Sequence, residues 1–205
     1  MMREHRFTHN LAHLPTHSFG PRSLTWWGTI SFMVIETTSF ILTFGAYFFL
    51  MSHEYDWPPE PWLPPDLLAG TLFTVILLLS EIPNTMTKHA AEAHDTAKVR
   101  KLLPLMGVIG AFLLVVRVFE FPSLNISWHD NAYGSIMWAL LVLHTALFAT
   151  DWVDTLVLAA LVQTPLGYEG RRLVDTSENS LYWRFVWIMW LPIYVMIYWL
   201  PRWFE

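Results

Sequence analysis

Two titratable side chains lie deep within long apolar stretches of the chain, Glu36 in the first stretch and His144 in the fourth. At a helical rise of about 1.5 Å per residue, each would sit roughly 16–18 Å from one end of its stretch. A charge inside a membrane costs about 2.5–3.5 kcal/mol on insertion scales, so each group calls for a reason. Both would lie near the midplane, where they could meet. They would form either a proton-titratable pair that lines a pathway or a hydrogen-bonded pair that pins two helices. The second interpretation is favoured, because one carboxylate and one imidazole make no proton relay by themselves.

A second charged group gathers near one end of the apolar stretches, on the expected inner side. It consists of Glu81, Asp151, Asp154 and Arg184. Asp151 and Asp154 share one face of a helix, since residues three apart are neighbours there. This pattern favours a salt-bridge cluster that joins helix ends.

Arg117 and Glu120 also share a helical face, near the outer end of the third apolar stretch. Their spacing predicts an ion pair. The alternative is that the long side chains extend to the outer lipid headgroups.

Four histidines recur at every fourth position of the N-terminal segment: His5, His9, His13 and His17. On a helix they would line one face, and histidine titrates near neutral pH, so the array suits proton collection or metal binding. Pro15 lies between the last two and interrupts a helix. Proton buffering, or no role, is therefore favoured over a metal site.

The composition places the chain in a membrane. Hydrophobic residues make up 54% of it and charged residues 14%, whereas soluble domains carry about 25% charged residues. This excludes a soluble enzyme and a disordered chain, and a net charge of −5 offers no basic surface for nucleic acid. The sequence contains no cysteine, which excludes disulfides, iron–sulfur clusters, cysteine zinc sites and thiolate-ligated copper.

Five stretches are long and apolar enough to cross roughly 30 Å of hydrocarbon as helices. They run approximately over Thr25–Met51, Asp66–Met86, Leu103–Phe121, Ala132–Val162 and Leu181–Pro201. The predicted fold class is therefore all-α: a five-helix transmembrane domain over residues 25–205, after a His-rich cytoplasmic segment at 1–24. Ten of the 12 Lys and Arg residues fall on one side of these helices, which predicts a cytoplasmic N-terminus and an outside C-terminus. The N-terminal segment has no apolar core, so no signal peptide is expected.

Several membrane chemistries lack the residues that they need. A bis-haem site requires paired intramembrane histidines, and only His144 is deep. A retinal protein requires a lysine within a span, and every lysine lies between the second and third stretches. The HExxH, GxSxG and P-loop motifs are absent. We therefore predict no catalytic residue and no metal or redox cofactor bound by the chain itself.

Ordered motifs with constant gaps run through most of the chain, roughly from residue 26 to 199. They are WWG at 26–28, FMVIE ending at Glu36, Ser80 with Thr85 and His89, Gly110 with Phe112, Glu120-Phe121, Tyr133-Gly134-Ser135, His144, and Glu178 before YWRFV at 182–186, followed by Trp190, Tyr194 and Tyr198. In these motifs the chain resembles subunit III of the haem–copper oxidases, in a short form with five helices.

Several polar positions depart from that family's pattern. The departures are Leu147 for His, Arg117 for Gln, Arg184 for His, Trp187 for Asp, and Glu81 and Asp151 for Gly. They predict a new ion network in which Arg184 compensates either Asp151 or Glu81.

The resemblance implies an accessory subunit, without a redox centre, of a terminal respiratory oxidase of the cytochrome c oxidase type. It implies packing on catalytic subunit I, association with subunit II and other respiratory subunits, bound phospholipid, and support of proton uptake. Haem and copper, and the reduction of O2, belong to partner subunits. Through the resemblance, five helices favour the plasma membrane of a prokaryote, and Glu36 and His144 become structural or proton-coupled residues.

Two alternatives stay open at this point. The first is the homologous subunit beside a quinol oxidase or a nitric-oxide reductase, which only the electron donor would distinguish. The second is a small proton-coupled transporter that uses Glu36, Glu81 and Asp151.

Overall fold

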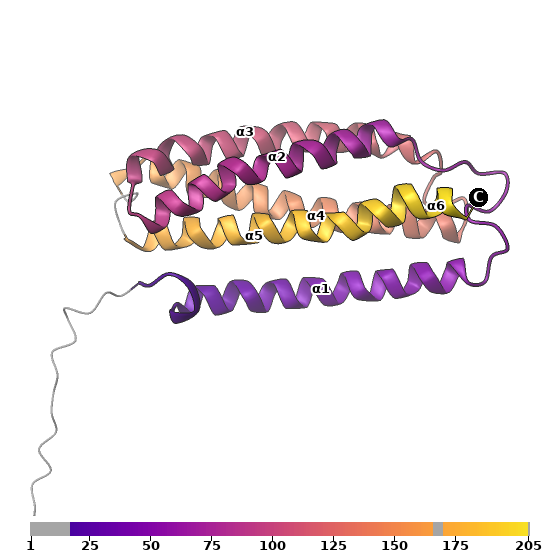
Figure 1. Cartoon of the computed structure of the whole chain (residues 1–205), viewed down its shortest axis with the longest axis horizontal. Coiled ribbons are helices and arrows are strands. Elements are labelled where there is room, and N and C mark those ends of the chain that lie inside the picture. The colour runs from indigo at the N-terminus through magenta and orange to yellow at the C-terminus, as the bar shows by residue number, and fades with distance from the viewer. Residues whose placement is uncertain (1–16, 166–169, 205) are drawn as a thin grey trace, which may run out of the picture.

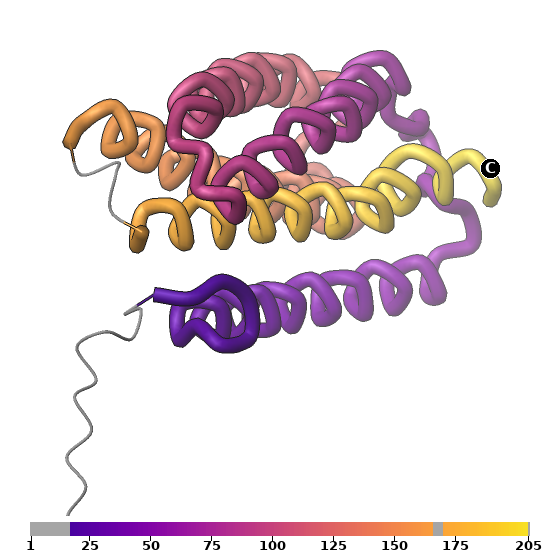
Figure 2. The backbone as a smooth tube through the Cα atoms, turned by 60° about the vertical axis from the view of Figure 1, so that its left-hand side comes forward, coloured from indigo at the N-terminus to yellow at the C-terminus, as the bar shows by residue number. Residues whose placement is uncertain are grey.

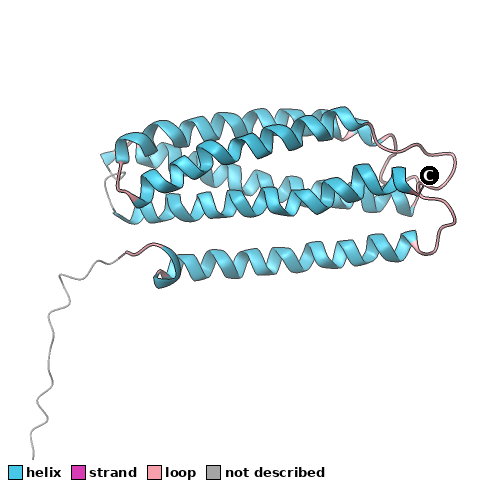
Figure 3. Ribbon diagram, in the orientation of Figure 1, coloured by secondary structure: helices cyan, strands magenta, loops and turns pink. Residues whose placement is uncertain are grey.

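The chain folds into long helices joined by short loops (Figure 3). The computed structural model describes residues 17–165 and 170–204. Within these ranges five helical segments are long and apolar enough to cross a membrane, and no strand occurs. They are α1 (Leu24–Met51), α2 (Leu67–Glu92), α3 (Thr96–Glu120), α4 (Ala132–Val162) and α5 (Gly170–Tyr194), which continues through the π-helical turn η4 (Val195–Trp199) into α6 (Leu200–Trp203). The predicted all-α fold with five spanning helices is confirmed.

Three helices are longer than the spans expected from the sequence. α2 continues past Met86, α3 begins before Leu103, and α5 begins before Leu181. All three extensions lie at the same end of the molecule and carry polar side chains. Apolar composition detects only the part of a helix that crosses hydrocarbon, whereas the backbone continues as helix until a cap ends it. The helices therefore protrude beyond their apolar segments at this end.

Helices α2 to α5 form a four-helix bundle, and α1 lies along one side of it (Figures 1 and 2). In the bundle α2 packs against α3 and α5, and α4 packs against α3 and α5, while α1 packs against α4 and α5. Much of α1 remains uncovered: Ile35 is 64% exposed and Leu42 is 71% exposed. This apolar surface suits lipid or another helix, not water.

Aromatic rings fill the middle of the bundle and approach small residues closely. The buried rings include Phe73, Trp183, Trp190 and Tyr198. A Cβ atom built on Gly70 would lie 2.3 Å from Cζ of Tyr198. Gly70 of α2 therefore makes the room in which the Tyr198 ring reaches the interior from the end of α5.

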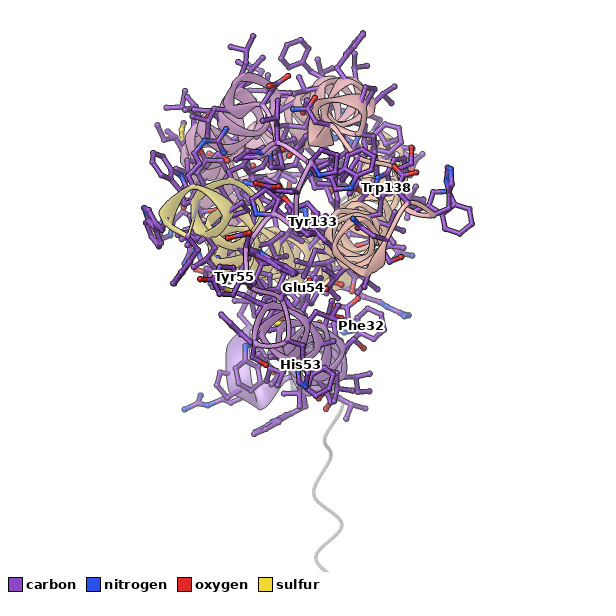
Figure 4. The ribbon with its side chains drawn as sticks, turned by 90° about the vertical axis from the view of Figure 1, so that its right-hand side faces the viewer. Phe32, His53, Glu54, Tyr55, Tyr133 and Trp138 are labelled. Atoms are coloured by element: carbon purple, nitrogen blue, oxygen red, sulfur yellow. The ribbon has the colours of Figure 1, made fainter. Side chains whose placement is uncertain are left out.

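Three aromatic side chains connect α1 to the bundle at the end where the α1–α2 loop lies. The hydroxyl of Tyr47 donates to the carbonyl oxygen of Met196 at 2.7 Å and accepts from Trp57 Nε1 at 2.7 Å. The Trp57 ring meets Tyr133 edge-on at 4.8 Å. Figure 4 shows Tyr133 among the helices, while Tyr55 lies on the adjoining loop. These contacts hold the far end of α1 against the bundle.

At the opposite end, Asp95 begins α3 as its N-cap. Its carboxylate accepts from the backbone N–H of Lys98 at 3.1 Å and pairs with Nζ of Lys98 at 2.9 Å. The Lys98 side chain, and then its backbone N–H, lower the pKa of Asp95 from its usual value. This capping interaction satisfies one of the free donors at the helix start.

Candidate functional site

Arg117 and Glu120 form a fully buried ion pair in the bundle. Arg117 Nη1 lies 2.7 Å from Glu120 Oε2, and the two side chains are 1% and 0% exposed. The other carboxylate oxygen of Glu120 accepts from the hydroxyl of Tyr198 at 2.7 Å. The predicted ion pair is confirmed, and the alternative of extension to the headgroups is wrong because aromatic side chains enclose the guanidinium. It lies 3.6 Å from the ring centroid of Phe73 and 4.3 Å from that of Trp190.

His144 is the third polar member of this buried cluster. Its Nδ1 lies 3.0 Å from Nη2 of Arg117, and its Nε2 lies 3.1 Å from the carbonyl oxygen of Val186. A guanidinium only donates hydrogen bonds and a carbonyl oxygen only accepts them. Nδ1 must therefore be the acceptor and Nε2 the N–H donor, which assigns a neutral imidazole in a single tautomer. Both ring nitrogens are occupied, and the ring acts to join α3, α4 and α5.

Glu36 does not meet His144, and the predicted pair between them is wrong. Glu36 instead accepts a hydrogen bond from the hydroxyl of Tyr182 on α5. Depth along a helix does follow from the sequence, but the direction in which a side chain faces depends on how the helices are arranged. Because α1 lies outside the four-helix bundle, its carboxylate reaches the near surface of α5 and not the bundle interior.

The four charged residues near the other end of the helices separate into two clusters. In the first, Nε of Arg184 lies 2.6 Å from Glu81 Oε1, which also accepts from the hydroxyl of Thr85 at 3.1 Å. Asn84 donates to the second oxygen of Glu81 and to the carbonyl oxygen of Ser180, both at 2.9 Å. Of the two partners expected for Arg184, Asp151 and Glu81, the structure thus pairs it with Glu81. The cluster joins α2 to α5.

In the second cluster, two carboxylates of α4 share a single amide. Asn179 Nδ2 donates to Asp151 at 3.1 Å and to Asp154 at 3.3 Å, while its oxygen accepts from Thr155 at 3.1 Å. The expected network of all four charged residues is thus wrong, because Arg184 faces α2 and leaves Asp151 without it. Asp151 is buried at 3% exposure.

A cavity of about 470 Å³ lies beside this second cluster, between α1, α4 and α5. Its wall includes Asp151, Asp154, Glu178 and Tyr182, together with apolar side chains such as Phe32. Glu178 is 5% exposed, although its position in a polar part of the sequence had given no sign of burial. The lining of the cavity thus combines several carboxylates with apolar side chains.

Three residues of the histidine array, His5, His9 and His13, lie outside the described residues, and His17 is exposed. Across residues 17–165 and 170–204, no group of three or more His, Asp or Glu side chains is arranged to hold a metal ion.

The fold and these clusters define a class: a polytopic membrane protein in which deep polar groups bond to one another across helices. Comparison with known proteins identifies the family within that class. The family model for cytochrome c oxidase subunit III matches residues 8–202, and the chain belongs to this family. The resemblance seen in the sequence motifs is confirmed.

Individual relatives agree along nearly the same length. The chain is 26% identical over 181 residues to cytochrome c oxidase subunit 3 of Synechocystis sp., a match that covers 87% of the chain and 77% of the relative. It is 23% identical to the Thermostichus vulcanus protein of the same name, over 85% of the chain and 87% of the relative. The Aedes aegypti protein of that name is 25% identical, over 84% of the chain and 68% of the relative. Relatives thus come from cyanobacteria and from an animal.

Proposed function

We propose that this chain is the accessory, non-redox subunit III of a respiratory cytochrome c oxidase. The family match over residues 8–202 carries the proposal. The geometry supports it, because Arg117, Glu120 and His144, three fully buried ionisable groups of the bundle, bond to one another and to other protein atoms. Reduction of O2, and the haem and copper that it needs, would belong to partner subunits.

The partners proposed are catalytic subunit I, subunit II and other subunits of the respiratory complex. The uncovered apolar side chains support such packing, since Val108 and Val118 on α3 are each 67% exposed and Leu42 on α1 is 71% exposed. Surfaces of this kind pack on helices or lipid inside a membrane. Phospholipid is proposed to cover the part of this surface that no partner covers, beside α1.

Support of proton uptake is the second part of the proposal. The helix extensions, the carboxylate-lined cavity and the majority of basic residues lie at one end of the bundle. By the positive-inside rule this end would face the cytoplasm, as would the N-terminus. The membrane proposed is the plasma membrane of a prokaryote, and Glu36 is assigned a proton-coupled or structural role there.

The test is purification in mild detergent through an affinity tag on this chain, followed by an optical spectrum and subunit identification. Two larger partners that carry haem and copper are expected to co-purify, and the chain separated from them should be colourless. A second copper centre would indicate cytochrome c as the electron donor, whereas a quinol oxidase or a nitric-oxide reductase as the partner would correct the type of complex. Recovery of the chain alone and colourless would overturn the proposal and favour the proton-coupled transporter.

A further inference from the structure

Buried polar atoms without partners concentrate around the cavity between α1, α4 and α5. Six buried side-chain nitrogen or oxygen atoms of the described residues have no hydrogen-bond partner, and three of them belong to residues that line this cavity. They are Oδ2 of Asp151, Oε2 of Glu178 and Nε of Arg172. Buried polar atoms in folded proteins nearly always have partners, so these three atoms mark a polar region of the helix interface beside the cavity.

Water suits such a region. One water molecule takes up about 30 Å³ in the liquid and needs two to four polar partners, and the cavity of about 470 Å³ offers room for several. Thr25, Thr29 and Thr150 line the same space. The cavity therefore has the size and the polar lining that water needs, although it lies between membrane-spanning helices.

Acidic side chains outnumber basic ones around this cavity. Arg172 forms an ion pair with Asp175, with 3.0 Å between its Nη1 and the carboxylate. Asp151 shares its amide donor Asn179 with Asp154. Asp154, which bonds to the same amide, is also acidic, and Arg184 pairs with Glu81 on α2 instead. A buried carboxylate among like charges, with no cation beside it, is expensive to keep ionised.

Charged groups from the remaining helices face other partners. Lys88 and Glu92 of α2 pair with each other at 3.9 Å, and Glu92 also accepts from the hydroxyl of Ser177. Arg100 of α3 donates to the carbonyl oxygens of Val162 and Thr164 at the end of α4. The described residues also hold no cluster with the geometry of a metal site. A proton is therefore the cation that this site suits.

We propose that Asp151 is a proton-binding site, whose carboxyl group carries its proton on Oδ2 at neutral pH and exchanges it with water in the cavity that the residue borders. Uptake forms one O–H bond at Oδ2 and breaks one O–H bond of a hydronium ion, leaving a water molecule behind. Tyr182 borders the same cavity and donates to Glu36, so the site is connected to the carboxylate of α1. The inference deepens the proton-uptake part of the proposed function and rests on it there, but the protonation of Asp151 can be read whether or not partner subunits co-purify.

The test is infrared spectroscopy of the complex purified through this chain, in wild type and Asp151→Asn, as a function of pH and in H2O and D2O. The wild type is expected to show one more protonated carboxyl per chain at pH 7 than Asp151→Asn. Its carbonyl band should shift in D2O and disappear at alkaline pH. Asp154→Asn removes the negative charge next to Asp151. The carbonyl band of Asp151 should therefore be weaker at neutral pH than in wild type, because a larger fraction of Asp151 is then ionised. Glu81→Gln is the matched control, because Glu81 is paired with Arg184 and its loss should leave the band unchanged.

A second measurement keeps the proposal open to refutation if Asp151→Asn does not fold. An apolar carbodiimide adds to a protonated carboxyl group, which gives up its proton to the reagent nitrogen, and the stable adduct is mapped by mass spectrometry of peptides. Modification of Asp151 in the wild-type complex is expected at pH 7 and should decrease as the pH rises. Spectra that are identical in wild type and Asp151→Asn would overturn the proposal, as would an Asp151 that stays unmodified at every pH.

Discussion

Arg117 and Glu120 lie one turn apart on α3 and form an ion pair with a distance of 2.7 Å and almost no exposure of either side chain. Side chains from two other helical segments bond to this ion pair. Tyr198 donates to the carboxylate, and the guanidinium donates to His144. The Nε of Arg117 is the one atom of this cluster with no partner. The pair therefore organises the middle of the bundle.

Replacement of Arg117 by Met is expected to destabilise the protein by about 3–5 kcal/mol, since removal of one partner leaves the other charge buried and unpaired. The double variant Arg117→Met with Glu120→Gln should be less destabilised than the sum of the two single variants. Unfolding in mixed detergents by increasing dodecyl sulfate measures all four proteins. Additive losses would show that the two side chains do not depend on each other.

The pairing of Arg184 gives a second prediction. Arg184→Leu should destabilise the subunit, and Glu81→Gln in the same chain should restore part of the loss, with a coupling of about 1 kcal/mol for groups in one network. Asp151→Asn serves as the control in the same cycle. Because Asp151 is bonded to Asn179 and not to Arg184, its effect should add to that of Arg184→Leu. Rescue by Asp151→Asn in place of Glu81→Gln would contradict the structure.

The sequence predicted contacts within a helix better than contacts between helices. The pair of Arg117 and Glu120 follows from helix geometry alone, because residues three apart share a face. The partner of Arg184 did not, since both Glu81 and Asp151 were compatible with the sequence. Only the packing of α5 against α2 decides between them. Glu36 shows the same limit: its depth was predictable, but its partner Tyr182 depends on where α1 lies.

The comparison of motifs pointed to more residues of the candidate site than the composition did. Tyr182 and Tyr198 belonged to the run that resembles the family, and both bond to carboxylates on other helices. Composition had supplied the spans but not the polar helix extensions, because the extensions are not apolar. Glu178 belonged to the same run of motifs, but neither its burial nor the cavity beside it could be predicted, since three separate helices form that space.

Close contact at Gly70 leads to a third prediction. A methyl group on Gly70 would lie 2.3 Å from the Tyr198 ring, and the hydroxyl group on that ring donates to Glu120. Gly70→Ala is therefore expected to cost about 1–3 kcal/mol, the usual range for overpacking. Gly45 of α1 is the matched control, because a Cβ there meets nothing within 4 Å. Gly45→Ala should leave stability unchanged or raise it by up to about 1 kcal/mol through helix propensity. Equal effects at both positions in the detergent unfolding assay would refute the packing explanation.

The cap of α3 leads to the fourth prediction, which concerns pH. Hydrogen bonds from Lys98 lower the pKa of Asp95 in the folded protein. The stabilisation from this carboxylate is therefore fully present above its unfolded pKa, about 3.9, and is lost as the pH falls through the folded pKa. Amide hydrogen exchange in the first turn of α3, corrected for intrinsic rates, should accelerate over that acidic range.

Two substitutions separate the charge of Asp95 from its role as a cap. Asparagine is also a good N-cap but does not ionise in this range, so Asp95→Asn should keep the first turn protected with little dependence on pH. Asp95→Ala removes the acceptor and should leave the turn poorly protected at neutral pH as well. If Asp95→Asn showed the same loss of protection in acid as the wild type, another group would control the start of α3. Lys98→Met provides the complementary measurement: it removes the side-chain partner at 2.9 Å while the backbone N–H remains. The acid transition should then move to higher pH, because the stronger of the two stabilising contacts on the carboxylate is gone.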